Sequence, residues 1–92
     1  MITLNFKKSG NMYVSDTIPY SGNGVTVQYK VPASTLTSEK MMLVEASLDG
    51  TNWYALGTLS TEEEVIKSIT GGTSMSMRLK CKNMPLLAQY IQ

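Results

Sequence analysis

Proton transfer and nucleophilic attack need a side chain with a tuned pKa beside a suitable partner, and few side chains in this sequence qualify. The chain has no His, so the choice falls on Asp, Glu, Lys, Tyr and a single cysteine, Cys81. Asp16, Glu45 and Asp49 are the carboxylates that could form an acid–base pair. Asp49 is already explained by a turn, and Glu45 by the solvent face of a strand. We therefore expect no enzymatic activity.

Metal and phosphate sites also lack the residues that they need. One Cys and no His leave neither a zinc ligand set nor an internal disulfide. Glu62-Glu63-Glu64 offers carboxylates to calcium, but no loop has the ligand spacing of an EF-hand, and a solvated loop explains the run better. Gly22, Gly24 and Gly71-Gly72 are not flanked by a strand–loop–helix unit, so no phosphate-binding loop is expected. The sequence predicts no metal and no cofactor.

A small basic stripe is the first surface feature that could bind a partner. Arg78, Lys80 and Lys82 alternate with apolar residues and should project from one face of one strand. The stripe could contact an acidic patch on a protein, or phosphates. Alternatively, its charges keep a solvent-facing strand from pairing edge to edge with other chains. Cys81 lies in the same run on the apolar side, where a small buried residue is expected.

Aromatic side chains are the second such feature. Trp53 and Tyr54 are consecutive, so in a strand they point to opposite faces and only one can lie in the core. We expect Trp53 to be buried and Tyr54 to be exposed. An exposed Tyr54, with Tyr13 and Tyr20, could stack on a sugar, but Tyr on a sheet face is equally common at protein interfaces.

Length and composition limit the partners. Ninety-two residues make one domain with a thin core. A net charge of +1 argues against duplex nucleic acid and against an anionic membrane surface. The amino terminus has its Lys7-Lys8 pair after a short apolar run, the reverse of a secretory signal, and no segment is apolar for long enough to span a bilayer. We expect a protein made in a cytoplasm.

The elements that would position these side chains are short strands. Residues 42–48 and 53–57 alternate with a period of two across Asp49-Gly50, a strong hairpin signal, and the hairpin should carry a large part of the core. Val25 to Val31 is the cleanest strand, with Val25, Val27, Tyr29 and Val31 on one face. With turn signals every 8–12 residues, the sequence predicts an all-β, single-domain antiparallel β-sandwich (jelly-roll or immunoglobulin-like) of about seven short strands.

The amino-terminal residues are predicted to behave differently from the rest. We expect residues 1–10 to form an arm or an edge strand and residues 11–92 to form the sandwich. In the arm, Ile2, Leu4 and Phe6 alternate with polar residues and could dock on a neighbouring subunit, and Lys7 to Asn11 reads as a turn. Met12 to Ser15 should be a short strand that ends at Asp16 and Pro19.

The central hairpin resembles a known signature. Ser47, Asp49, Gly50 and Trp53 match the "S-x-DG-x-x-W" strand–turn–strand pattern of small β-sandwich proteins in tailed-phage particles, such as capsid decoration, auxiliary and head-fibre proteins. The same pattern occurs in discoidin-like carbohydrate-binding sandwiches. There a later strand ends in aromatic-Ile-Arg, whereas this chain has Tyr90-Ile91-Gln92. The match covers about a sixth of the chain.

The resemblance implies a non-enzymatic virion protein, made in the cytoplasm of a bacterial host, that decorates and stabilises a capsid shell. The expected partners are the major capsid protein or other virion proteins and further copies of the chain, with a trimer as one option, and neither nucleic acid nor membrane. Ile2, Leu4, Phe6, Tyr54, Arg78, Lys80 and Lys82 are the expected partner contacts. The alternatives are a carbohydrate-binding module that uses Tyr54, and an adaptor in a phage tail or neck.

Overall fold

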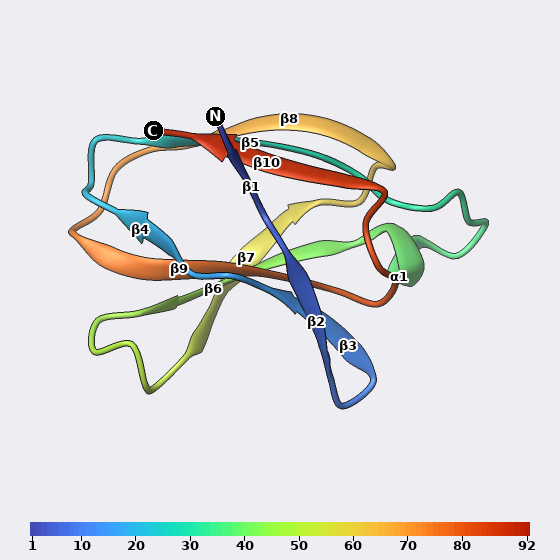
Figure 1. Cartoon of the computed structure of the whole chain (residues 1–92), viewed down its shortest axis with the longest axis horizontal. Coiled ribbons are helices and arrows are strands. Elements are labelled where there is room, and N and C mark those ends of the chain that lie inside the picture. Colours follow the sequence, from blue (N-terminus) through green and yellow to red (C-terminus); the bar gives the residue numbers. More distant parts are fainter.

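Two antiparallel β-sheets pack face to face in the computed structural model, which describes residues 1–92 (Figure 1). Sheet A has four strands in the order β1 (Ile2–Thr3), β10 (Leu87–Ile91), β5 (Val25–Lys30) and β8 (Glu64–Ile69). Sheet B has the order β2 (Phe6–Ser9), β3 (Met12–Ser15), β9 (Met75–Cys81), β6 (Met42–Ser47) and β7 (Tyr54–Ser60), and β4 (Ile18–Tyr20) also pairs with β9. One helical turn, α1 (Thr37–Lys40), precedes β6. The predicted all-β antiparallel sandwich is confirmed, with ten strands in place of about seven.

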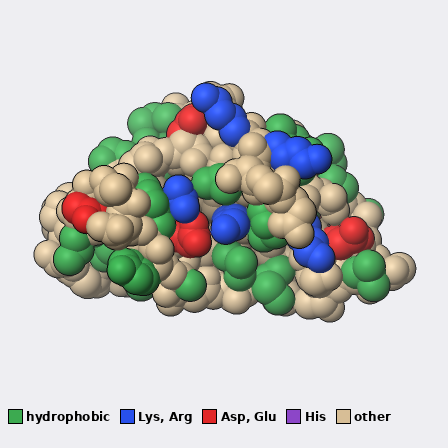
Figure 2. All heavy atoms as spheres, turned by 90° about the horizontal axis from the view of Figure 1, so that it is seen from below, with side chains coloured by type: hydrophobic (Ala, Val, Ile, Leu, Met, Phe, Trp, Pro, Cys, Tyr) green, Lys and Arg blue, Asp and Glu red, His purple; other side chains and the backbone are tan.

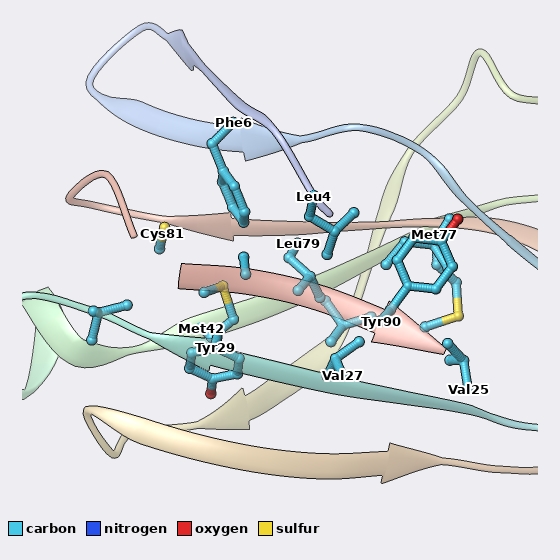
Figure 3. Packing of buried hydrophobic residues seen from close by; sticks show 14 of the residues in the cluster. Leu4, Phe6, Val25, Val27, Tyr29, Met42, Met77, Leu79, Cys81 and Tyr90 are labelled. Atoms are coloured by element: carbon cyan, nitrogen blue, oxygen red, sulfur yellow. The ribbon is translucent and has the colours of Figure 1, made fainter. Parts of the chain in front are cut away.

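Alternating apolar residues of β5 and β9 build the centre of the core (Figure 3). Val25, Val27 and Tyr29 are at most 2% exposed, and Met77 and Leu79 on the opposite sheet are fully buried. Both strands lie inside their sheets, so one face of each meets the other sheet and the other face meets solvent. Removal of these side chains from water is the main stabilising term. The period-two predictions for both strands are confirmed.

The first ten residues pass from one sheet to the other. β1 pairs with β10 at one edge of sheet A, and β2 pairs with β3 at one edge of sheet B. Between them, the backbone N–H of Asp16 donates to the carbonyl of Asn5 at 2.9 Å, and the backbone N–H of Asn5 donates to Asp16 Oδ2 at 3.1 Å. The segment therefore consists of two edge strands, and the crossing between them is held in place by these two hydrogen bonds.

The crossing buries two of the three residues that were expected at a partner surface. Leu4 is 5% exposed and Phe6 8% exposed, and both belong to the core cluster, whereas Ile2 is 51% exposed. Leu4 and Phe6 are thus packed inside their own chain, because the segment closes the space between the two sheets. The predicted turn is also shorter than expected, since Lys7 and Lys8 extend β2 and only Gly10 and Asn11 turn the chain.

β4 differs from the sequence prediction as well. Pro19 does not end a strand but lies inside β4, opposite Ser76 of β9. Pro lacks a backbone N–H, and β4 tolerates it because its only neighbour is β9 and its other edge is free. β3 and β4 both pair with β9, at its carboxyl and amino ends respectively.

The β6–β7 hairpin is confirmed, but its tip extends away from sheet A (Figure 1). Met42 and Val44, near the start of β6, are buried, whereas no residue of β7 is buried. Trp53 is only half-buried and lies outside the core cluster, so its predicted place in the core is wrong. The reason is that the two aromatic residues lie on the faces opposite to those expected: Trp53 lies over Arg78 on the outer face of sheet B, whereas Tyr54 pairs with Ala46 on the side toward sheet A. Tyr54 is nevertheless exposed, because sheet A does not extend over the tip and alternation buries a side chain only where a second layer covers it.

Candidate binding surfaces

Asp49 organises the hairpin turn. Its Oδ1 accepts hydrogen bonds from the hydroxyl of Ser47 at 2.8 Å and from the backbone N–H groups of Thr51 at 2.9 Å and Asn52 at 2.8 Å. Its Oδ2 accepts from Asn52 Nδ2 at 2.7 Å, and the N–H of Gly50 donates to Ser47 Oγ at 2.8 Å. These bonds, the Asn52 backbone bond first, hold the pKa of Asp49 well below its ordinary value. The serine and aspartate of the signature therefore shape the turn, and its hydrogen bonds favour the ionised form of Asp49.

A groove opens beside this turn, on the side of the hairpin that faces sheet A. It measures about 410 Å³, and the side chains that give it its apolar character are Ala46, Leu48, Tyr54 and Met75, with Thr73 at its rim. Leu48 is 82% exposed and Tyr54 73% exposed, whereas Ala46 and Met75 also pack against the core. We call this surface the hairpin groove. It is a continuation of the core that no second layer covers.

A second hollow of about 520 Å³ adjoins the hairpin groove and shares Leu48 and Met75 with it. Its other lining residues are mostly neutral and polar: Pro19, Tyr20, Ser21, Ser74, Ser76 and Gln92. Of the predicted contacts, only Tyr54 lies in this region. The place of Leu48 and Met75 at this groove could not be predicted from alternation, which indicates only that they share a face with apolar residues of the same strand and not whether that face is covered.

The outer face of sheet B carries the predicted basic stripe, but its charges are largely paired (Figure 2). Arg78 Nε lies 2.8 Å from Glu45 Oε1, and Lys80 Nζ lies 3.8 Å from Glu45 Oε2. Lys82 follows the end of β9 and is exposed. Since β9 lies between two strands, these charges do not guard a sheet edge, and that interpretation is wrong. Glu45 neutralises much of the field that would attract an acidic or phosphate-bearing partner.

Trp53 covers this ion pair from one side. The guanidinium carbon of Arg78 lies 4.2 Å from the centroid of the Trp53 ring, a cation–π contact. Glu45 and Arg78 face each other across the β6–β9 register, which brings the two charges together. The last residue of the hairpin signature thus anchors the turn to the outer face of the sheet.

The two other groups with perturbed pKa values lie in the interior. Burial raises the pKa of the Cys81 thiol to about 11, and its Sγ donates to the carbonyl of Asn83 at 3.2 Å. Burial is also the main cause of the raised pKa of Tyr29, whose buried hydroxyl lies near Ser60 but forms no hydrogen bond of normal geometry. Both shifts favour the neutral form, the opposite of an activated nucleophile. The predicted burial of Cys81 is confirmed.

No three Cys, Asp or Glu side chains lie close enough together to hold a metal ion. The structure has no helix with the length and apolar character needed to cross a membrane. No protein-family model, no curated protein and no solved structure matches this chain.

Proposed function

We propose that this chain is a non-enzymatic structural protein of a tailed-phage particle, an auxiliary or decoration protein that binds and stabilises the capsid shell. The observation that carries the proposal is the hairpin groove, where an apolar extension of the core stays uncovered. The phage assignment draws on the hairpin signature, whose Ser47, Asp49 and Trp53 all have specific contacts in the structure.

The energetics of the groove favour a protein partner. Leu48 and Tyr54 are 82% and 73% exposed. Complete burial of a large apolar side chain contributes about 1.5–3 kcal/mol, so a subunit that covers both gains several kcal/mol before the costs of association. A decoration protein placed across a junction between major capsid subunits would add this contact to the shell and make disassembly costlier.

The titratable groups also support a structural role. Asp49 is saturated by turn hydrogen bonds, and Cys81 and Tyr29 are held neutral in the interior. Tyr29 and Cys81 lie close enough to interact, but burial favours the neutral form of both, whereas proton-transfer catalysis needs a pKa near the working pH.

Mass spectrometry of purified particles from the source of this gene tests the virion assignment. We expect a copy number on the order of hundreds, near that of the major capsid protein or a simple fraction of it. A count of about six or twelve would reassign the chain to a neck or tail ring, the adaptor alternative. Absence from the particles would refute the proposal.

A matched pair of variants tests the hairpin groove itself. Leu48→Lys should weaken binding to particles stripped of this protein by at least about tenfold, because a charge would enter an apolar contact. Leu36→Lys is the control, since Leu36 is 58% exposed and lies beside α1, at the other end of the molecule from the hairpin tip (Figure 1). Equal binding by both variants would rule out the groove as the docking site.

Carbohydrate binding is the second candidate, and the position of Tyr54 favours it. Tyr54 lines the hairpin groove together with Asn52, Thr73 and the carboxylate of Asp49, so that an aromatic side chain and polar groups that can bond sugar hydroxyls line one groove. Tyr54→Ala should then abolish binding of a surface glycan in calorimetry, whereas Tyr54→Phe should keep the stacking contact. Loss of particle binding without any glycan binding would exclude this candidate.

A further inference from the structure

We propose that the outer face of sheet A is a homodimer interface, at which two copies of this chain stack face to face about a two-fold axis. This face consists of the solvent-facing residues of β10, β5 and β8, with Met1 beside them. In Figure 1 no element lies above sheet A. The proposal does not depend on the virion assignment.

The strand registers arrange this face in three rows, each with one residue from β10, β5 and β8. The central row is Gln89, Gln28 and Ile66. The rows on either side are Ile91, Thr26 and Ser68, and Leu87, Lys30 and Glu64. The apolar members are substantially exposed: Ile66 69%, Ile91 52% and Leu87 43%, with Met1 at 78%.

Each row is fixed by a cross-strand contact. Gln89 Nε2 donates to Gln28 Oε1 at 2.7 Å, and the hydroxyls of Thr26 and Ser68 lie 2.9 Å apart. Lys30 Nζ lies 3.1 Å from Glu64 Oε1. Side chains that are already paired lose less conformational freedom when a partner covers them. The face is therefore preorganised, and the entropic cost of association is lower.

The two outer faces of the sandwich differ in charge. On sheet B, the Glu45–Arg78–Lys80 cluster lies on the neighbouring inner strands β6 and β9. Figure 2 shows several charged side chains on this side of the molecule. On sheet A, the single ion pair, Lys30–Glu64, lies in a flanking row, and the central row is uncharged. The cores of protein interfaces are depleted in charged residues. This depletion favours the outer face of sheet A over that of sheet B as the interface.

The rows are chemically self-complementary. The two-fold axis proposed here lies in the plane of the interface and runs along the central row, perpendicular to the strands. Rotation about this axis places Ile66 against Ile66 of the second copy and Gln28 against Gln28. It also brings Leu87 against Ile91, Lys30 against Thr26 and Glu64 against Ser68. Apolar residues thus meet apolar residues, amides meet amides, and each charge meets a hydroxyl instead of a like charge. Such self-complementarity is what an isologous dimer requires.

The size of the face fits a weak, reversible dimer. Its three strands have five or six residues each, so the face measures roughly 20 Å along the strands and roughly 15 Å across them, which is smaller than a standard stable interface and in the range of transient ones. Aligned sheets stack about 10 Å apart, which leaves room for one layer of interdigitated side chains from each copy.

The edge strands of both sheets are poorly suited to pairing with strands of another copy, so we expect copies to associate through a sheet face. β1 has two residues, and β2 carries Lys7 and Lys8. On β8, Lys67 lies opposite Val27 and so points to the core side of an edge strand. β7 is bulged relative to β6 at two places. Short edges, lysines and bulges all discourage strand addition.

Sedimentation equilibrium of the whole chain from about 1 µM to about 0.5 mM tests the proposal. We expect a reversible monomer–dimer equilibrium, weakened at least tenfold in Ile66→Lys and in Ile91→Lys, while Leu36→Lys dimerises like the wild type. Circular dichroism and the Tm of each variant establish that it is folded. A wild-type chain that stays monomeric, forms trimers, or dimerises equally well as Ile66→Lys would overturn the proposal.

Cross-linking tests the geometry of the dimer. Because Gln28 faces Gln28 across the axis, Gln28→Cys should give a covalent dimer with a short bis-maleimide, whereas Thr26→Cys, which faces Lys30, should not. Cys81 is fully buried and does not compete. Equal cross-linking by both variants, or by neither, would refute this register. If the chain is monomeric and Ile66→Lys instead abolishes particle binding, the face belongs to another virion protein and the dimer is refuted.

Discussion

The guanidinium of Arg78 lies 4.2 Å from the centroid of the Trp53 ring, and its Nε also contacts Glu45 at 2.8 Å. One side chain therefore joins the hairpin turn, the middle strand β9 and the neighbouring strand β6. The arrangement fixes the orientation of the hairpin whose other side forms the hairpin groove.

Removal of this cation should be visible in the fluorescence of the only Trp. We expect Arg78→Met to change the emission of Trp53 and to lower the free energy of unfolding by about 0.5–2 kcal/mol, because the cation–π contact and the ion pair are lost while the aliphatic part of the side chain is kept. Urea titration followed by fluorescence measures both effects. Lys82→Met is the control, and an equal change in both variants would contradict the assignment.

Glu45→Gln should destabilise the fold by about 1–2 kcal/mol, between the values typical of exposed and of buried ion pairs. The Glu45 side chain is 16% exposed, and its loss would leave Arg78 and Lys80 as neighbouring unpaired cations. Thermal unfolding measures the effect, which added salt should reduce. Glu62→Gln is the exposed control. A neutral result would mean that the cluster does not contribute to stability.

Phe6→Ala should lower the free energy of unfolding by about 3–5 kcal/mol, because it opens a cavity in the core. Ile2→Ala, on the exposed edge strand β1, should change it by less than about 0.5 kcal/mol. Chemical denaturation of both variants provides the comparison. If Phe6→Ala were as stable as the wild type, the first residues would be a detachable arm after all.

Asp49 should make the hairpin turn sensitive to acid. The pKa of its carboxyl is lower in the folded chain than the ordinary 3.8, so the unfolded state binds more protons in this range and stability falls as the pH drops below about 4. Asp49→Asn lacks this titration. The difference in Tm between wild type and Asp49→Asn should therefore shrink between pH 5 and pH 2, and a constant difference would contradict the turn geometry.

Cys81 should resist thiol reagents in the native state. Its pKa is raised from 9.0 to about 11, so the thiol stays protonated at pH 8, and the buried sulfur is inaccessible. Labelling with a disulfide reagent should proceed only as fast as the chain unfolds. The stability that this group contributes is fully present below pH 9 and is lost as the pH rises through about 11. Rapid labelling of folded protein would refute its burial.

The class of the fold and the strands at its centre could be predicted from local patterns. Alternation places Val25, Val27 and Tyr29 on one face of β5, and it separates the basic stripe of β9 from apolar residues that include Met77 and Leu79, because successive residues of a strand point to opposite faces. All five of these apolar residues are buried. The hairpin around Asp49-Gly50 was likewise predictable, since its hydrogen bonds join residues within three positions of one another.

Which apolar faces are covered follows from how the two sheets pack. Alternation predicts Trp53 in the core and places Leu4 and Phe6 in an arm or edge strand that could dock on a neighbouring subunit, whereas in the structure Trp53 lies outside the core cluster and Leu4 and Phe6 belong to it. The tertiary structure also pairs Glu45 with Arg78, 33 positions apart. Local periodicity tells which residues share a face, but burial depends on whether a second sheet lies over that face, and this is set by contacts between segments far apart in the chain.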